Sequence, residues 1–338
     1  MTSAAAASAE VLLRVEDLQT VFENRHQRFA AVDNLGFKVL RGQTLGIVGE
    51  SGSGKTMTAL SVMRLLPEQG RVSGGRIEYG GRDLTELPEA EMRKLRGKEM
   101  SMIFQDPIMS LDQVYTVGYQ IVEAIRVHEH MSKKDAEARA LDLLASVGIP
   151  HPARVFSSYP FQLSGGMCQR AMIAIALSCN PRLLFADEPT TALDVTVQAQ
   201  ILDLLKNLQR ENQMGIVLIT HDLGVVADFA DRVIVMYAGK AMEAAPTETI
   251  MRRPAHPYTA GLIKAMPKLA ETAEYLHAIP GTVPDIRNMP TGCRFSTRCA
   301  LAEERCRNEE PVRREIEPGH FARCHRAMPQ GEGGIRID

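Results

Sequence analysis

The chain has 338 residues, a length that allows two domains or one large domain with an appendage. Its residues are 45% hydrophobic and 24% charged, which is the balance of a globular protein and excludes a chain that is disordered throughout. Lys and Arg number 39 against 41 Asp and Glu, and this net charge of −2 argues against a protein that coats nucleic acid.

The N-terminal tip, Met1–Glu10, is rich in alanine but lacks the basic and apolar regions of a secretory signal, so we expect a disordered segment. No apolar run approaches the roughly 18 residues that a membrane-spanning helix needs. These two observations predict a cytosolic chain, which remains free to dock on a membrane protein.

The next segments predict an α/β domain. Leu45–Val48 is a short apolar strand that runs into a Gly/Ser-rich loop, and Thr56–Leu66 is a helix that Pro67 ends. Residues 110–165 have a helical character. From residue 183 strands and helices alternate again, and after about residue 245 the composition shifts to Pro, Arg and Cys, where we place a boundary. The elements expected between these points are helices at Val117–Arg126, Lys134–Val147 and Val195–Gln209 and strands at Leu183–Ala186, Gly215–Thr220 and Arg232–Tyr237.

Residues Gly49–Thr56 fit the phosphate-loop pattern G-x-x-x-x-G-K-[ST] between the first predicted strand and helix. In such a loop the glycines let backbone N–H groups face phosphate oxygens, and the helix that follows adds its dipole. Lys55 would reach the β- and γ-phosphates and the Thr56 hydroxyl would bind Mg²⁺. A merely flexible loop is the alternative. The remaining predicted nucleotide-binding residues of the motif are Gly49, Ser51, Gly52, Ser53 and Gly54.

Two further sites support this interpretation. The apolar strand at Leu183–Ala186 ends in Asp187 and Glu188, of which the first can hold Mg²⁺ and the second can polarise the attacking water. A solvated acidic turn is the alternative. His221 follows the strand Gly215–Thr220, at the edge where parallel sheets bind ligands, although a lone histidine is more often structural.

The segment Leu163–Arg170, with the sequence L-S-G-G-M-C-Q-R, resembles the signature motif of ABC ATPases. Ser164 is a plausible N-cap, and with Gly165 and Gly166 it forms a second anion site at a helix start. The resemblance implies that two ABC subunits pack head to tail, so that each signature closes on the ATP of the other. A simple helix cap is the alternative for this motif in isolation.

The remaining elements of the ABC pattern occur in order along the chain. Gln105 resembles the Q-loop residue, Asp194 ends an Ala-Leu-Asp segment that resembles the D-loop, and His221 resembles the switch histidine. Phe22 lies where the family places an aromatic ring on adenine, with Phe29 as a rival and core packing as the alternative. The family's mechanism then implies that Lys55, Gln105, Glu188 and His221 are catalytic, and that Mg²⁺ is arranged by Thr56, Gln105 and Asp187.

Finer resemblance comes from the tail. Arg253–Thr259 and the run Pro189–Thr196 resemble the ATP-binding subunits of bacterial dipeptide- and oligopeptide-type ABC importers. This implies an ABC ATPase cassette over residues 11–245, with RecA-like core, β subdomain and helical subdomain at about 110–165, followed by an extension over 246–338. It also implies a second, related ATPase subunit, two permease subunits and, indirectly, an extracytoplasmic binding protein, at the cytoplasmic face of the inner membrane.

Four of the six cysteines lie in the extension, at Cys293, Cys299, Cys306 and Cys324. Their spacing, C-x5-C-x6-C-x17-C, lacks the close cysteine pairs of most zinc sites, and four thiolates are the usual ligands of a [4Fe–4S] cluster. Members of the resembled subfamily carry such a cluster here, in a role that is structural or redox-sensing. Zinc and unliganded thiols remain alternatives, with His320 and His325 as stray ligands. Cys168 and Cys179 are expected to be buried and unreactive.

The transported substrate is not encoded in this chain, because relatives also move nickel, glutathione or sugars. A soluble ABC ATPase of DNA repair or translation is a distant alternative, since this chain has one cassette and no coiled-coil heptads.

Overall fold

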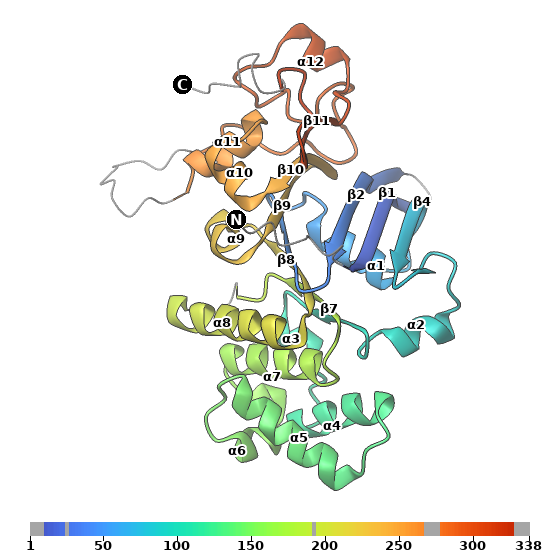
Figure 1. Ribbon diagram of the computed structural model, residues 1–338, viewed down its shortest axis with the longest axis vertical. Coiled ribbons are helices and arrows are strands. Elements are labelled where there is room, and N and C mark those ends of the chain that lie inside the picture. Colours follow the sequence, from blue (N-terminus) through green and yellow to red (C-terminus); the bar gives the residue numbers. More distant parts are fainter. Residues whose placement is uncertain (1–9, 24–26, 191–193, 267–277, 328–338) are drawn as a thin grey trace, which may run out of the picture. The chain divides into compact units, whose positions relative to one another are not determined.

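A computed structural model describes residues 10–23, 27–190, 194–266 and 278–327 (Figure 1). Of the predicted disordered tip Met1–Glu10, only Glu10 is therefore described, and its carboxylate pairs with Arg41 and Arg182. The chain forms two compact units. Among the described residues, the helical unit comprises 10–13, 38–43, 79–190 and 194–217, and the P-loop unit comprises 14–23, 27–37, 44–78, 218–266 and 278–327. The strand β8 (Gly215–Thr220) crosses from the first unit to the second.

The P-loop unit is built on hydrogen-bonded strands. The long strands β1 (Val11–Glu23), β2 (Arg28–Leu40) and β4 (Gly70–Tyr79), which lie mostly in this unit, are ordered β2-β1-β4. The strand β3 (Thr44–Val48) is fully buried and pairs in parallel with β9 (Arg232–Tyr237). The helices of the P-loop unit are α1 (Lys55–Met63), α9 (Leu223–Phe229), α10 (Thr247–Arg252), α11 (Pro257–Lys264) and α12 (Glu304–Asn308).

The extension adds strands to β9. The strand β10 (Lys240–Pro246) pairs antiparallel with β9 on one side and with β12 (His320–Ala322) on the other, and β12 pairs with β11 (Arg314–Glu317). The domain boundary that we place at residue 245 stays a prediction. In the structure β10 passes this position and joins the strands on both sides of it.

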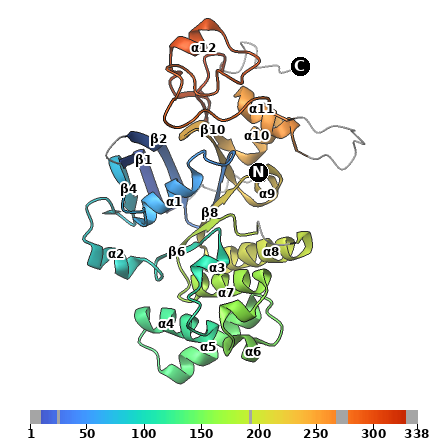
Figure 2. The same cartoon turned by 180° about the vertical axis from the view of Figure 1, so that it is seen from behind.

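The helical unit contains the parallel strands β6 (Met100–Ile103) and β7 (Leu183–Asp187), in which every residue is buried. Figure 2 shows its helices from behind, with α3 lying against α7, in agreement with Figure 1. The helical segments are α2 (Glu89–Leu95), α3 (Pro107–Ser110), α4 (Val117–His128), α5 (Lys133–Ser146), α6 (Pro152–Phe156), the 3-10 turn η1 (Pro160–Gln162), α7 (Gly165–Leu177) and α8 (Val195–Asn212); β5 (Arg82–Asp83) is a short strand.

The predicted elements match the observed ones closely in the cassette. The strands at Gly215–Thr220 and Arg232–Tyr237 have the predicted bounds. The first helix ends at Met63 and not at Leu66, because Arg64 adopts a left-handed φ of 51° and ends it before Pro67. Within the described part of the chain, no helix has both the length and the apolar character that crossing a membrane requires.

Candidate functional site

The predicted phosphate loop connects β3 to α1 and depends on glycine for its shape. A Cβ at Gly49 would lie 2.1 Å from the carbonyl oxygen of Met236, and one at Gly54 would lie 2.4 Å from that of Ala31. Gly54 also has a φ of 97°, which side-chain-bearing residues rarely adopt. A Cβ at Gly52 would meet no described atom within 4 Å, so the loop leaves open space on that side.

The polar groups inside the loop are arranged for an anion. The buried Lys55 Nζ donates to the carbonyl oxygens of Gly49 and Glu50 at 2.8 and 3.0 Å. The Ser53 hydroxyl is also buried and has no hydrogen-bond partner among the described residues. Thr56 lies half-buried in the first turn of α1. A phosphate in this loop would give the Ser53 hydroxyl a hydrogen-bond partner and would lie beside the positively charged Lys55 side chain.

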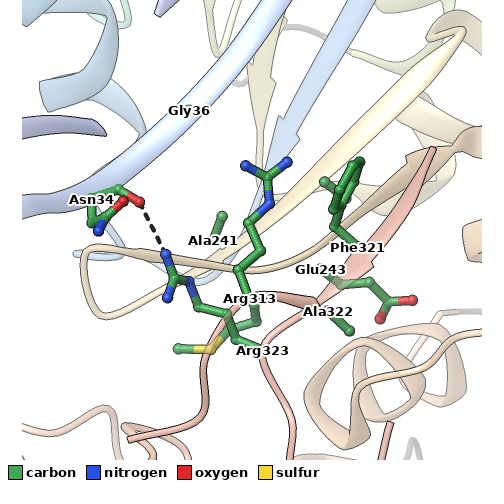
Figure 3. Close-up of a pocket in the computed structure, with 10 residues that line it drawn as sticks. Asn34, Gly36, Ala241, Glu243, Arg313, Phe321, Ala322 and Arg323 are labelled. Atoms are coloured by element: carbon green, nitrogen blue, oxygen red, sulfur yellow. Dashed lines mark hydrogen bonds between the residues drawn. The ribbon is translucent and has the colours of Figure 1, made fainter. Parts of the chain in front are cut away.

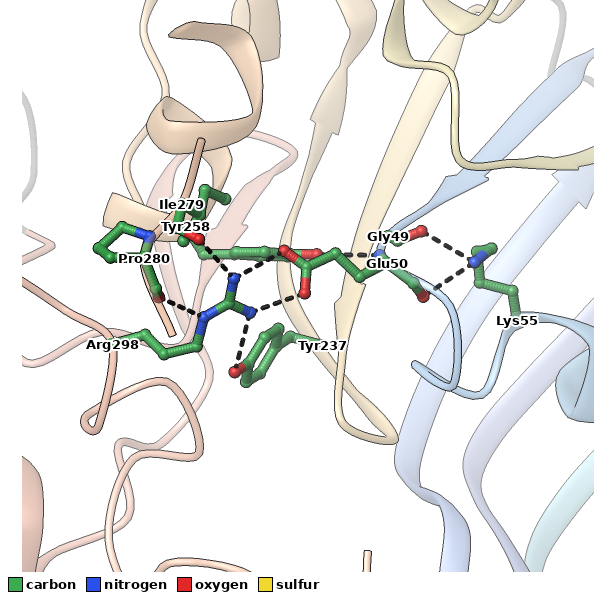
Figure 4. Close-up of polar contacts among 8 residues, drawn as sticks. All are labelled: Gly49, Glu50, Lys55, Tyr237, Tyr258, Ile279, Pro280 and Arg298. Atoms are coloured by element: carbon green, nitrogen blue, oxygen red, sulfur yellow. Dashed lines mark hydrogen bonds and ion pairs between the residues drawn. The ribbon is translucent and has the colours of Figure 1, made fainter. Parts of the chain in front are cut away.

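Sequence reasoning missed how the loop is held from outside. Both carboxylate oxygens of Glu50 bind Arg298 of the extension, with N–O distances of 2.6 and 3.1 Å (Figure 4). The Glu50 N–H donates to the Tyr258 hydroxyl at 3.0 Å. Arg298 also donates to the carbonyl oxygens of Ile279 and Pro280. Residues far apart in the sequence therefore form one polar cluster against the phosphate loop.

In the helical unit, the acidic pair lies at the end of β7 as predicted. Asp187 is the last residue of the strand and is buried. Glu188 follows with a left-handed φ of 47°, a strained backbone conformation for a residue with a side chain. Gln105 donates from Nε2 to the Glu188 carboxylate at 3.2 Å. The structure thus brings together the predicted Q-loop glutamine and the predicted catalytic carboxylate.

The signature motif begins a helix, as predicted. Ser164 is the N-cap of α7, and its hydroxyl accepts a hydrogen bond from the Met167 N–H. Gln169, one turn further on, was not predicted to matter. It is fully buried, and its Nε2 donates to the Pro189 carbonyl oxygen at 2.6 Å. This bond ties the signature helix to the residue that follows Glu188.

His221 and Asp194 lie at element ends. His221 is exposed between β8 and Asp222, which caps α9. The Asp194 carboxylate caps α8 by accepting from the Val197 N–H at 2.9 Å. The two residues that precede Asp194 in the predicted D-loop lie outside the described part of the chain.

The two candidate aromatic residues lie together. The rings of Phe22 and Phe29 stack with their centroids 5.6 Å apart, and the Phe22 ring also lies beside Gly70. The structure therefore pairs the rivals and does not select one of them for adenine.

Each unit holds part of the predicted nucleotide site. The helical unit holds Gln105, Ser164, Gly165, Gly166, Asp187, Glu188 and Asp194, and the P-loop unit holds Phe22, Gly49, Ser51, Gly52, Ser53, Gly54, Lys55, Thr56 and His221.

The predicted cluster ligands gather at one cavity of the P-loop unit. Its lining includes all four cysteines of the extension, Cys293, Cys299, Cys306 and Cys324, together with His256 and His325. The six cysteines of the chain are all free thiols. Burial raises the pKa of Cys293 to about 11 and raises the pKa values of Cys299 and Cys324 as well. Among the described residues, however, no group of three or more His, Cys, Asp or Glu is placed to hold a metal ion.

The other cysteines behave as expected. Cys168 and Cys179 are buried, with Sγ atoms near the carbonyl oxygens of Pro160 and Ala124. Burial raises the pKa of both thiols and so lowers the fraction of reactive thiolate.

A second cavity of the P-loop unit contains no residue predicted from the sequence. Figure 3 shows it between Asn34 and the strands of the extension. Arg323 donates to the Asn34 carbonyl oxygen, and Arg313 lies over the Phe321 ring at 4.2 Å. Both guanidinium groups thus help to pack the extension, although the buried Arg323 Nε has no hydrogen-bond partner among the described residues.

Comparison with known proteins identifies the family. Residues 32–191 match the profile described as ABC transporter, and residues 242–306 match the one described as oligopeptide/dipeptide transporter, C-terminal region. A profile for an AAA domain (putative AbiEii toxin, type IV TA system) matches residues 158–227.

Relatives match over nearly the whole chain. The dipeptide transport ATP-binding protein DppD of Escherichia coli is 49% identical over 93% of this chain and 96% of its own length. A putative peptide import ATP-binding protein of Brucella abortus is 47% identical, over 94% and 98%. The dimeric ATP-binding cassette MJ0796 bound to ADP and Pi superposes with a TM-score of 0.65 and 26% identity, over 70% of this chain and 99% of that one. The chain therefore belongs to the ATP-hydrolysing subunits of ABC peptide importers.

Proposed function

We propose that the chain hydrolyses ATP at the loop Gly49–Thr56 to power the import of di- and oligopeptides. The observation that carries this proposal is the loop itself: its curl depends on glycine, Lys55 is buried, and the Ser53 hydroxyl has no partner within the part of the chain that the structure describes. The peptide substrate is supported by the names of the relatives and by the oligopeptide/dipeptide transporter region.

The residues of the proposed site have distinct roles in ATP hydrolysis. Lys55, Ser51 and Gly54 hold the phosphates, and Glu188 accepts a proton from the attacking water while His221 contacts the γ-phosphate. The Gln105–Glu188 hydrogen bond supports this role, because it fixes the carboxylate in one orientation. Mg²⁺, which neutralises charge on the phosphates, would be held by the oxygen atoms of Thr56, Gln105 and Asp187.

A second ATPase subunit of related sequence would complete the site. Ser164 and Gly166 lie exposed or half-exposed at the start of α7, where they are free to meet the ATP of a partner. The similar cassette MJ0796 has been solved as a dimer, which supports the pairing of two such subunits.

The permease would dock on the helical unit, at the cytoplasmic face of the inner membrane. Large apolar side chains are exposed between residues 104 and 119, which include the Q-loop. The Val117 N–H donates to the Ser158 carbonyl oxygen, so the exposed side chains near residue 160 lie close to this segment. Such a concentration of exposed apolar side chains is typical of an interaction surface. The exposed side chains are Phe104, Ile108, Met109, Val114, Tyr115, Tyr119, Tyr159 and Phe161.

We further propose an iron–sulfur cluster at the cysteine cavity. Its support is the convergence of four free thiols on one cavity. Four cysteine thiolates are the usual ligand set of a [4Fe–4S] cluster, and the spacing of these cysteines lacks the close pairs of most zinc sites, so we favour iron–sulfur over zinc. When bound, the cluster would supply cross-links that fold the short extension.

The role of Glu188 tests the proposal. We expect Glu188→Gln to bind ATP as the unchanged chain does but to lose steady-state hydrolysis by about 100-fold or more, because the proton acceptor is gone. The measurement is phosphate release by the assembled transporter. Glu211→Gln, an exposed position at the end of α8, is the matched control. Unimpaired hydrolysis by Glu188→Gln would refute the assignment.

A further inference from the structure

Arg298 of the extension uses its whole guanidinium group at the phosphate loop. Nη1 binds one Glu50 oxygen at 2.6 Å and the Tyr237 hydroxyl at 3.4 Å. Nη2 binds the other Glu50 oxygen and the Ile279 carbonyl oxygen, both at 3.1 Å, and Nε binds Pro280 at 2.9 Å. All five N–H donors of the side chain therefore have acceptors. Its side chain is only 5% exposed and that of Glu50 is 27% exposed, so solvent screens this ion pair less than it screens one on the open surface.

Glu50 is fixed at every polar group by this arrangement (Figure 4). Its carboxylate binds Arg298, its N–H donates to Tyr258, and its carbonyl oxygen accepts from Lys55 at 3.0 Å. Lys55 is also the residue that would reach the β- and γ-phosphates. The same short segment is thus held by the extension on one side and by the phosphate-binding lysine on the other.

The charge of Glu50 makes this contact more than a structural link. Glu50 belongs to a loop whose proposed ligand carries several negative charges, and a carboxylate there repels such a ligand. A paired carboxylate presents little net charge, whereas an unpaired one in a poorly solvated place is costly. Among the described residues, Arg298 is the only arginine or lysine that forms an ion pair with Glu50.

We propose that Arg298 is a positioning residue for nucleotide binding: it neutralises Glu50 and holds the phosphate loop in its binding shape. This inference rests on the proposed phosphate loop. It makes the extension part of the nucleotide site, because the loop Cys293–Cys299 that carries Arg298 also lines the cysteine cavity.

The experiment measures the affinity of the full chain for AMP-PNP, together with kcat and KM for ATP. We expect Arg298→Ala to weaken binding about ten-fold and to raise KM more than it lowers kcat, a typical coupling between neighbouring sites. Arg298→Lys keeps the positive charge but cannot bind both Glu50 oxygens at once as a guanidinium does. We expect its affinity for AMP-PNP to lie between those of the unchanged chain and Arg298→Ala. In the double variant Arg298→Ala/Glu50→Gln, removal of the repelling carboxylate should restore most of the affinity.

Two controls make the result decisive. Arg253→Ala removes another paired arginine, which binds both oxygens of Glu317 at 3.1 Å away from the loop, and should leave the affinity unchanged. Lys55→Ala tests the phosphate loop itself: if it binds AMP-PNP normally, the proposed nucleotide site fails. If Lys55→Ala loses binding but Arg298→Ala binds like Arg253→Ala, only the present inference is overturned. The inference is also overturned if the double variant binds AMP-PNP as weakly as Arg298→Ala. Should Arg298→Ala not fold, the affinity of Arg298→Lys is measured in its place, and an affinity equal to that of Arg253→Ala overturns the inference.

Discussion

At the scale of single residues, the thiols show how position decides chemistry. Cys179 is buried next to Ser178 in the helical unit, whereas Cys299 lines the cavity of the extension with three other cysteines. The same residue type is thus an inert packing group in one place and a candidate ligand in the other. Iron–sulfur clusters are held by several cysteine thiolates, which lose their protons when the metal binds. Only a set of cysteines that face one cavity can therefore act as cluster ligands.

Cysteine substitution tests this difference. We expect the chain purified without oxygen to be brown and to contain iron and sulfide, and Cys299→Ser to lose both because one cluster ligand is gone. Cys179→Ser is the matched control and should keep the colour and the iron. The measurements are the visible absorption spectrum and iron analysis. Colour and iron that survive in Cys299→Ser would remove this cysteine from the ligand set.

At the scale of elements, the signature helix and the catalytic strand are joined by one buried bond. Gln169 in α7 donates to the carbonyl oxygen of Pro189, which directly follows Glu188. Glu188 itself has a left-handed backbone conformation. A strained conformation persists only where its surroundings hold it. We infer that α7 helps to hold Glu188 in place, in addition to presenting Ser164.

The variant Gln169→Met tests this connection. It keeps the side-chain volume but leaves the Pro189 carbonyl oxygen without its donor, at a cost of about 1–3 kcal/mol of stability. We expect kcat to fall several-fold while ATP affinity stays the same, because the change displaces the proton acceptor Glu188 and leaves the groups that bind the phosphates in place. Steady-state kinetics with a nucleotide titration checks both. Unchanged kcat would show that Glu188 keeps its place without this bond.

At the scale of the whole molecule, the extension is joined to the cassette through a buried carboxylate. Glu243 of β10 is 1% exposed and accepts hydrogen bonds from the Ala255 and His256 N–H groups and from His320 Nε2 at 2.7, 3.0 and 2.7 Å. All three partners belong to the extension, so the last cassette strand depends on the segment that follows it.

Truncation tests this dependence. A chain that ends at residue 245 lacks all three donors to Glu243 and the pairing of β10 with β12, at a cost of about 1 kcal/mol for each hydrogen bond lost. We expect it to be insoluble or to unfold at much lower urea concentration. A chain that ends at Ala327 keeps every contact named here and should unfold like the full chain. An equally stable 245-residue chain would show that the cassette folds alone.

Much of this protein follows from the sequence alone. The phosphate-loop pattern, the acidic strand end and the signature motif are local, so each predicts its own strand, loop or helix start, and the structure places Ser164, Asp187 and Lys55 on the predicted elements. The two strands predicted at Gly215–Thr220 and Arg232–Tyr237 likewise have the bounds of β8 and β9.

Only the tertiary structure determined which distant residues meet. Glu50 and Arg298 are 248 positions apart, and Glu243 and His320 are 77 apart, so no spacing or periodicity in the sequence links them. The convergence of four irregularly spaced cysteines on one cavity has the same origin. Which side chains pair across a fold depends on the order of the strands and on the paths of the connections between them. That information is spread over the whole chain, whereas a binding motif consists of a few consecutive residues.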